Sequence, residues 1–278
     1  MLGLLMGALW LGLGWVWLGL HPTGHADALY LSDLLQCLSA GRSLGTWDLP
    51  PAPSLFPDLG LLACLRGFTP TLLASLQAYG TLMAAALWLV LARLLRQVFQ
   101  ISGGLARAHS AAGLILVLCL CPLGSGLLAW NLPGQHGWAF IVALGLWAWA
   151  LRQKERPSGL GRSLILAFFL GLLVQSDPVF WVWAILPVAL LSLRLNRAGH
   201  RRLGAMLLLT GFSAWLAGRA LAATGARTAS LQWRFIFLRS AEDWAALRLQ
   251  GPIFIRTHAV LLGVVVLALG LWVWPRAQ

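Results

Sequence analysis

The chain has 278 residues, of which 59% are hydrophobic and only 10% are charged, and its mean hydropathy is +0.80. An average soluble domain carries about 25% charged residues, so this composition argues against a soluble enzyme, a disordered chain and a coiled coil. Basic residues number 20 and acidic residues 8, which gives a net charge of +12. In so apolar a chain, the excess predicts basic loops on the cytoplasmic side of a membrane rather than a nucleic-acid-binding surface.

Eight apolar segments predict an all-α, polytopic integral membrane protein, because roughly 20 apolar residues cross a bilayer. They cover residues 2–20, 72–95, 111–130, 138–151, 163–175, 179–195, 203–223 and 259–274. A continuous helix over 163–195 would be about 50 Å long, well beyond a ~30 Å hydrocarbon core. Pro178 also disfavours a continuous helix, so we expect two short spans there. No basic residue precedes the first segment, which favours an uncleaved span over a signal peptide.

The basic residues cluster in alternate loops. With eight spans, every cluster and both chain termini lie on the cytoplasmic side, as the positive-inside rule requires; with seven spans, the cluster at 194–202 would lie outside. We therefore expect one integral domain over 1–278 in a bacterial inner membrane, with two long outer loops at 21–71 and 224–258. The clusters are Arg93, Arg96 and Arg107; Arg152, Lys154, Arg156 and Arg162; and Arg194, Arg197, Arg201 and Arg202.

The first outer loop holds four of the eight acidic residues, Asp27, Asp33, Asp48 and Asp58. Residues 28–40 place leucines at i, i+3, i+4 and i+7, which predicts an amphipathic helix on the membrane surface that ends at Gly41. A proline-rich run at 50–53 then predicts an extended return. The carboxylates are either solvated loop residues or an acidic site for a lipid-linked substrate. Cys37 and Cys64 share this loop, and a disulfide between them stays open.

An aspartate just beyond the first span, a surface helix and a proline-rich return resemble the polytopic glycosyltransferases of the GT-C superfamily. Segments 25–30 (HADALY) and 51–58 (PAPSLFPD) are also similar to uncharacterised bacterial membrane proteins with that loop pattern. The resemblance implies that Asp27 is a catalytic base or metal ligand. It also implies a sugar donor carried on polyprenyl phosphate and leaves a divalent metal open as cofactor.

Further candidate residues lie at other outer positions. Asp177, at the tip of the predicted hairpin, either meets water or faces the same cavity as Asp27 and supplies a second carboxylate. The last outer loop predicts one or two interfacial helices. Arginines in and before this loop either contact lipid headgroups or clamp the phosphate of a donor through paired hydrogen bonds; they are Arg219, Arg227, Arg234 and Arg239. A metal site at His21 and His25 is disfavoured, because Pro22 and Gly24 break the helix that it needs.

The leading hypothesis is thus glycosyl transfer at the outer membrane face, with Asp27, Asp58 and Asp177 as the catalytic carboxylates. Two alternatives stay open. A lipid or small-molecule transporter would need repeats or polar residues within several spans. A non-catalytic membrane scaffold is favoured by the short chain and by Ala28, which stands where the superfamily usually has a second acidic residue.

Overall fold

Six long helices follow the apolar segments in the computed structural model, which describes residues 1–20, 26–50, 53–120, 136–153, 159–178, 180, 184, 188 and 197–228. These helices are α1 (Leu2–Leu20), α4 (Leu72–Phe99), α5 (Gly103–Leu120), α7 (Gly137–Gln153), α8 (Leu160–Ser176) and α10 (Arg197–Ala223). The predicted all-α class is confirmed for this part of the chain. Most of the predicted span at 179–195, and all of that at 259–274, lie outside the described residues.

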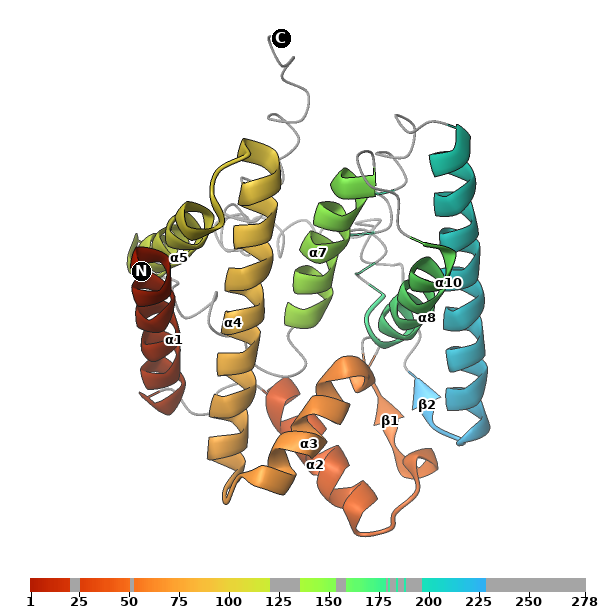
Figure 1. The fold of residues 1–278 in the computed structure, drawn as a ribbon. Coiled ribbons are helices and arrows are strands. Elements are labelled where there is room, and N and C mark those ends of the chain that lie inside the picture. Colours follow the sequence, from red (N-terminus) through yellow and green to blue (C-terminus); the bar gives the residue numbers. More distant parts are fainter. Residues whose placement is uncertain are drawn as a thin grey trace, which may run out of the picture.

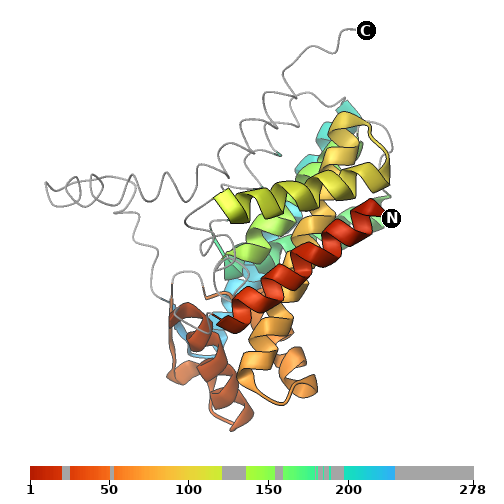
Figure 2. The same ribbon diagram turned by 90° about the vertical axis from the view of Figure 1, so that its left-hand side faces the viewer.

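The helices pack as two groups joined by α7. Helices α1, α4 and α5 contact one another, α7 packs against α4, and α8 packs along α10 (Figures 1 and 2). Two buried or half-buried indoles connect the first group: Nε1 of Trp10 donates to the carbonyl oxygen of Ala84 at 3.0 Å, and Nε1 of Trp88 donates to that of Arg107 at 2.9 Å. These bonds satisfy polar groups that would be costly to bury alone.

Two described helices, Leu72–Phe99 and Gly204–Ala223, are long and apolar enough to cross a bilayer. Three further apolar stretches, Leu2–Val16, Gly137–Ala150 and Gly161–Ser176, are shorter. The predicted break after the fifth span is present, since α8 ends at Ser176 and Asp177 has an extended backbone. The count of eight spans stays a prediction.

The first loop folds into two short helices. The predicted helix in this loop is present as α2 (Ala26–Ser39). It is followed by a turn at Ala40 and Gly41, and the φ of +77° at Gly41 suits glycine. The apolar face of α2 does not lie open for a membrane surface, because Leu31 packs on Leu62 and Leu76. Leu62 belongs to α3 (Gly60–Phe68), a helix that the sequence analysis did not predict.

The first loop is also joined to the start of the last one. After the turn η1 (Leu44–Thr46), strand β1 (Asp48–Leu49) pairs in parallel with β2 (Arg227–Thr228), with Asp48 opposite Arg227. The turn η2 (Leu55–Leu59) then leads into α3. In Figure 1, α2, α3 and both strands gather at one end of the helices. Residues that are 179 positions apart in the chain thus meet, since Asp48 pairs with Arg227.

Candidate functional site

A small cavity lies where the first loop meets the end of α8 and the start of α7. Its walls come from three separate segments, within residues 54–58, 136–139 and 173–177. The space that the centre of a water molecule can occupy is about 10 Å³, which is room for roughly one water. Asp58, His136 and Asp177 all line it, together with apolar residues such as Trp138 and Leu173, so polar and apolar side chains share its walls.

Backbone hydrogen bonds hold the first loop against α8. The N–H of Ser54 donates to the carbonyl oxygen of Ser176 at 3.0 Å, and the N–H of Phe56 donates to Oγ of Ser176 at 2.8 Å. The Phe56 ring stacks on that of Phe169, with centroids 5.9 Å apart. Ser54 has a φ of +49°, in the left-handed region, which redirects the chain into η2. The loop is therefore anchored directly before Asp177.

Asp58 is 4% exposed and lies in η2. Its Oδ1 accepts a hydrogen bond of 2.7 Å from the Tyr79 hydroxyl, which comes from the interior of α4. A buried carboxylate is costly unless it is hydrogen-bonded or paired. The phenol therefore helps to keep Asp58 in place at the cavity wall.

Asp177 and His136 form the second polar pair. Nδ1 of His136 lies 2.7 Å from Oδ2 of Asp177; the Asp177 side chain is 5% exposed and the His136 side chain 37% exposed. The Asp177 N–H donates to the carbonyl oxygen of Leu173 at 2.7 Å, and His136, directly before α7, has a φ of +59°. The pair thus joins the end of one helix to the start of another.

Two of the three predicted catalytic residues therefore share this cavity. Asp58 and Asp177 both line it. Asp27 lies in the first turn of α2, but its side chain is outside the described residues. The structure thus does not test whether Asp27 reaches the cavity.

The predicted phosphate clamp is only partly described. Arg219 is exposed on α10, and the backbone of Arg227 belongs to β2. The Arg227 side chain, Arg234 and Arg239 lie outside the described residues, as do His21 and His25. Within the residues that the structure describes, no group of three or more His, Cys, Asp or Glu side chains is arranged to hold a metal ion. Cys37 and Cys64 are free thiols, so no disulfide joins them.

Sequence reasoning missed two members of the site. They are His136, which precedes a predicted span, and Tyr79, which lies within one. The sequence gives a weak signal for each: His136 is an ionisable residue at the end of a predicted span, and Tyr79 is one of two tyrosines in the chain. Neither signal predicts which carboxylate the residue contacts.

Comparison of the chain with protein-family models, with curated proteins and with solved structures gives no match. The resemblance to GT-C glycosyltransferases therefore rests on the residues of the first loop.

Proposed function

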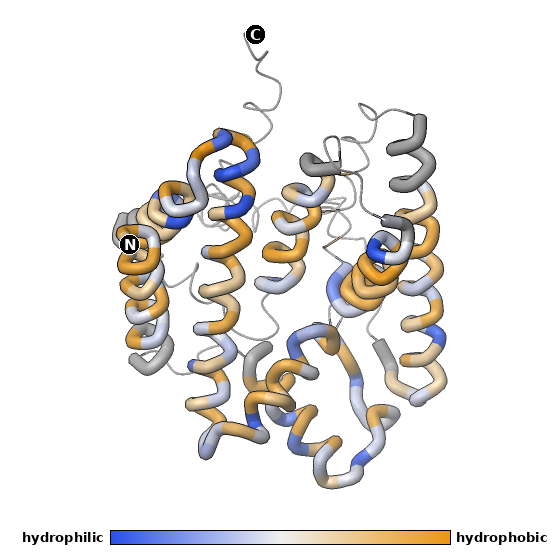
Figure 3. Tube along the Cα trace, viewed as in Figure 1, coloured by the Kyte–Doolittle hydropathy of each residue, from blue (hydrophilic) through white to orange (hydrophobic). Residues whose placement is uncertain are grey.

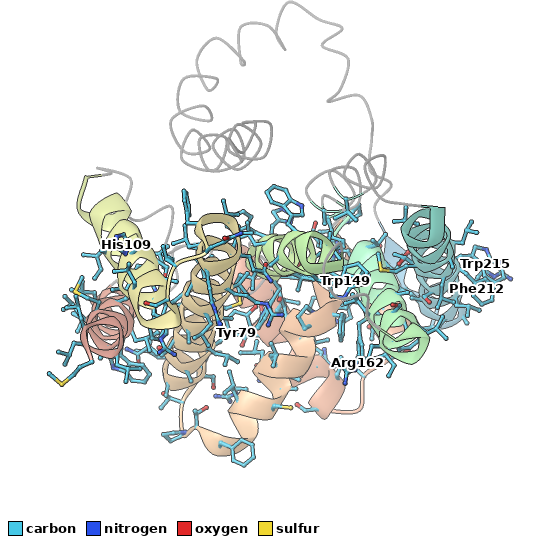
Figure 4. The ribbon with its side chains drawn as sticks, turned by 45° about the horizontal axis from the view of Figure 1, so that its top comes forward. Tyr79, His109, Trp149, Arg162, Phe212 and Trp215 are labelled. Atoms are coloured by element: carbon cyan, nitrogen blue, oxygen red, sulfur yellow. The ribbon has the colours of Figure 1, made fainter. Side chains whose placement is uncertain are left out.

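We propose that the chain is a polytopic membrane protein with about eight spans. The outward faces of its helices support this, because large apolar side chains stand exposed along α1, α8 and α10; Leu2, Ile165 and Leu208 are 63%, 63% and 79% exposed. Figure 3 shows hydrophobic residues along the length of these helices, and in Figure 4 the stacked pair Phe212 and Trp215 points away from the bundle. Apolar surface of this extent suits lipid better than water.

In this proposal the end of the helices that carries the first loop faces outward. Arginines gather near the opposite end, at the end of α4 and the starts of α5 and α8: Arg93, Arg96, Arg107 and Arg162. In Figure 1, α4 runs away from the first loop whereas α10 runs towards it, as spans of opposite direction should. The positive-inside rule then makes the arginine-rich end and both chain termini cytoplasmic, in a bacterial inner membrane.

The activity that we propose is transfer of a glycosyl group from a polyprenyl-phosphate-linked donor at the outer face. The observation that carries it is that Asp58 and Asp177, from the first loop and the end of α8, line one cavity. A carboxylate beside a reacting hydroxyl can act as the general base or position the group that does. The first-loop resemblance adds Asp27 as base or metal ligand, and arginines Arg219, Arg227, Arg234 and Arg239 as contacts for the donor phosphate.

The size of the cavity limits how a substrate binds. Room for about one water excludes a sugar ring from the cavity itself. The sugar and the lipid phosphate must therefore lie outside, with one reacting hydroxyl directed at the cavity. His136, which is 37% exposed, is the cavity residue that such a hydroxyl would meet.

A transfer assay tests the proposed function. The full chain in lipid nanodiscs is incubated with radiolabelled polyprenyl-phosphate sugars and candidate acceptors, and loss of label from the lipid is measured. We expect Asp27→Asn to abolish transfer and Asp177→Asn to lower its rate. Asp33→Asn, which changes an exposed carboxylate on α2, is the matched control and should retain it. Transfer at the unchanged rate in both Asp27→Asn and Asp177→Asn would refute the assignment.

One observation favours a transporter as a second candidate. A buried carboxylate paired with a histidine beside a water-sized cavity is also the arrangement of a proton relay in membrane transport. Proteoliposomes that contain a pH-sensitive dye distinguish the two functions. Proton uptake that requires Asp177, without any transfer of label, would favour transport over glycosyl transfer.

A further inference from the structure

We propose that His136 is the residue that takes the proton from the acceptor hydroxyl, and that Asp177 positions it. This inference rests on the proposed glycosyl transfer and goes beyond it, because the first-loop resemblance assigns a base role to Asp27 alone. It follows from the contact of 2.7 Å between Nδ1 of His136 and Oδ2 of Asp177 at the cavity wall.

The two partners differ in burial: the positioning residue Asp177 is buried, and the proposed base His136 is partly exposed. The Asp177 side chain is 5% exposed, whereas that of His136 is 37% exposed. The carboxylate is thus held inside the protein, while the ring reaches towards the surface where a substrate can approach. The backbone of Asp177 is held in place, because its N–H donates a hydrogen bond to the carbonyl oxygen of Leu173 and the neighbouring Ser176 anchors the first loop.

The contact also sets the tautomer of the ring. A carboxylate oxygen accepts hydrogen bonds, so we assign the ring hydrogen to Nδ1 of His136, which then donates the hydrogen bond to Oδ2 of Asp177. In the neutral ring, Nε2 is then the basic nitrogen. Hydrogen bonding of the ring N–H to a carboxylate raises the basicity of this nitrogen and stabilises the imidazolium that forms when it takes a proton.

The chemical step balances with these groups alone. The acceptor oxygen forms a bond to the anomeric carbon of the donor sugar, and the bond between that carbon and the phosphate oxygen breaks. The electron pair of the broken bond leaves with the lipid phosphate. The proton of the acceptor hydroxyl moves to Nε2 of His136, at the wall of the cavity that Asp58 also lines.

The backbone of His136 decides which variant tests this role. Its φ of +59° is a conformation that asparagine tolerates better than most residues. An asparagine amide also donates to a carboxylate but does not accept a proton at neutral pH. His136→Asn therefore removes the base and keeps the fold. His109→Asn is the matched control, since Nδ1 of His109 lies 2.9 Å from the carbonyl oxygen of Leu105 on its own helix, on the other side of the bundle from α10 (Figure 4).

The first experiment measures kcat for transfer across pH. We expect His136→Asn to lower kcat by about 100-fold or more, the usual contribution of a general base, with the donor KM little changed. Asp177→Asn should lower kcat and displace the pH profile, whereas His109→Asn should do neither. Full activity in His136→Asn with loss of activity in Asp27→Asn would overturn the role of His136 and leave the proposed function intact.

The second experiment determines the tautomer of the His136 ring and does not depend on transfer activity. The chain has six histidines, so ¹⁵N-histidine labelling of the protein in nanodiscs gives few ring signals, and His136→Asn identifies the one that disappears. We expect an Nδ1–H, unprotonated Nε2 signal for His136 that changes in Asp177→Asn. An Nε2–H tautomer would overturn the inference whatever the activity. Absence of transfer by the unchanged protein with all donors would overturn the proposed function and this role together.

Discussion

The Tyr79 hydroxyl donates a hydrogen bond of 2.7 Å to Oδ1 of Asp58, although the tyrosine is within α4 and the aspartate is in the loop before α3. Both residues are almost fully buried, at 1% and 4% exposure. The bond therefore joins the first loop to the core of the helices at the level of the cavity. Removal of this bond should lower the stability of the protein and change the position of the Asp58 side chain.

Tyr79→Phe should destabilise the protein. The change removes the phenol donor and leaves a buried carboxylate with one hydrogen bond fewer, which costs about 1–3 kcal/mol. A lower midpoint of thermal unfolding in detergent is the expected result. Tyr30→Phe is the control, because the Tyr30 hydroxyl is buried without a hydrogen-bond partner within the described part of the chain. Equal midpoints for the two variants would contradict a stabilising role for the Tyr79–Asp58 bond.

Tyr30 should ionise only at unusually high pH. Burial on α2, where its ring meets Trp47 edge-on with centroids 6.0 Å apart, raises the pKa of Tyr30 to about 12 from the ordinary 10.0. The folded pKa lies above the unfolded one, so the stabilisation is complete below pH 10 and is lost as pH rises towards 12. The chain has two tyrosines, so absorbance titration at the phenolate band in Tyr79→Phe reports Tyr30 alone. A midpoint near pH 10 would show that the phenol is solvated.

The long helices were predictable because each is a long apolar run, and the end of α8 was predictable from Pro178. Helix α3 was not, because its nine residues begin with one glycine and contain a second, Gly67, which favour turns in isolation. It forms because Leu62 is buried against α2 and α4. That tertiary contact also explains why the apolar face of α2 covers protein, although its leucine spacing alone fits a membrane surface equally well.

The carboxylates of the site were identifiable from sequence, but their partners were not. Asp177 stood out as an acidic residue at the end of a span, and a shared cavity with a first-loop aspartate was expected. The structure makes that aspartate Asp58, whereas the side chain of Asp27 is not described. His136 is 41 residues from Asp177, and no local pattern predicts a side-chain contact over such a separation.

Gly171 should be intolerant of substitution because α8 and α10 approach closely there. A Cβ at this position would lie 2.7 Å from the carbonyl oxygen of Thr210 and 2.8 Å from the backbone nitrogen of Ala214, and would also meet Cβ of Ser213. Small residues permit this kind of helix contact in membranes. Gly171→Ala should therefore cost about 1–3 kcal/mol through overpacking, seen as a lower unfolding midpoint. Gly211→Ala, where a Cβ meets nothing within 4 Å, should not lower it; equal effects would argue against close packing at Gly171.

Ser176→Ala should loosen the first loop without changing any carboxylate. The variant removes the Oγ atom that accepts the Phe56 N–H at 2.8 Å, and an unsatisfied, partly buried N–H costs about 1–3 kcal/mol. The Ser54 bond remains, because it uses the backbone oxygen of Ser176, so the loop should open locally more often and not unfold. Hydrogen exchange at residues 53–59 measures this directly.

The control variant is Ser39→Ala, which removes an exposed hydroxyl from α2 and should leave hydrogen exchange at residues 53–59 unchanged. The same slow exchange in both variants would show that Ser176 does not anchor the loop. Faster exchange confined to Ser176→Ala, together with reduced transfer, would establish that the reactive geometry depends on how the first loop is fastened to α8.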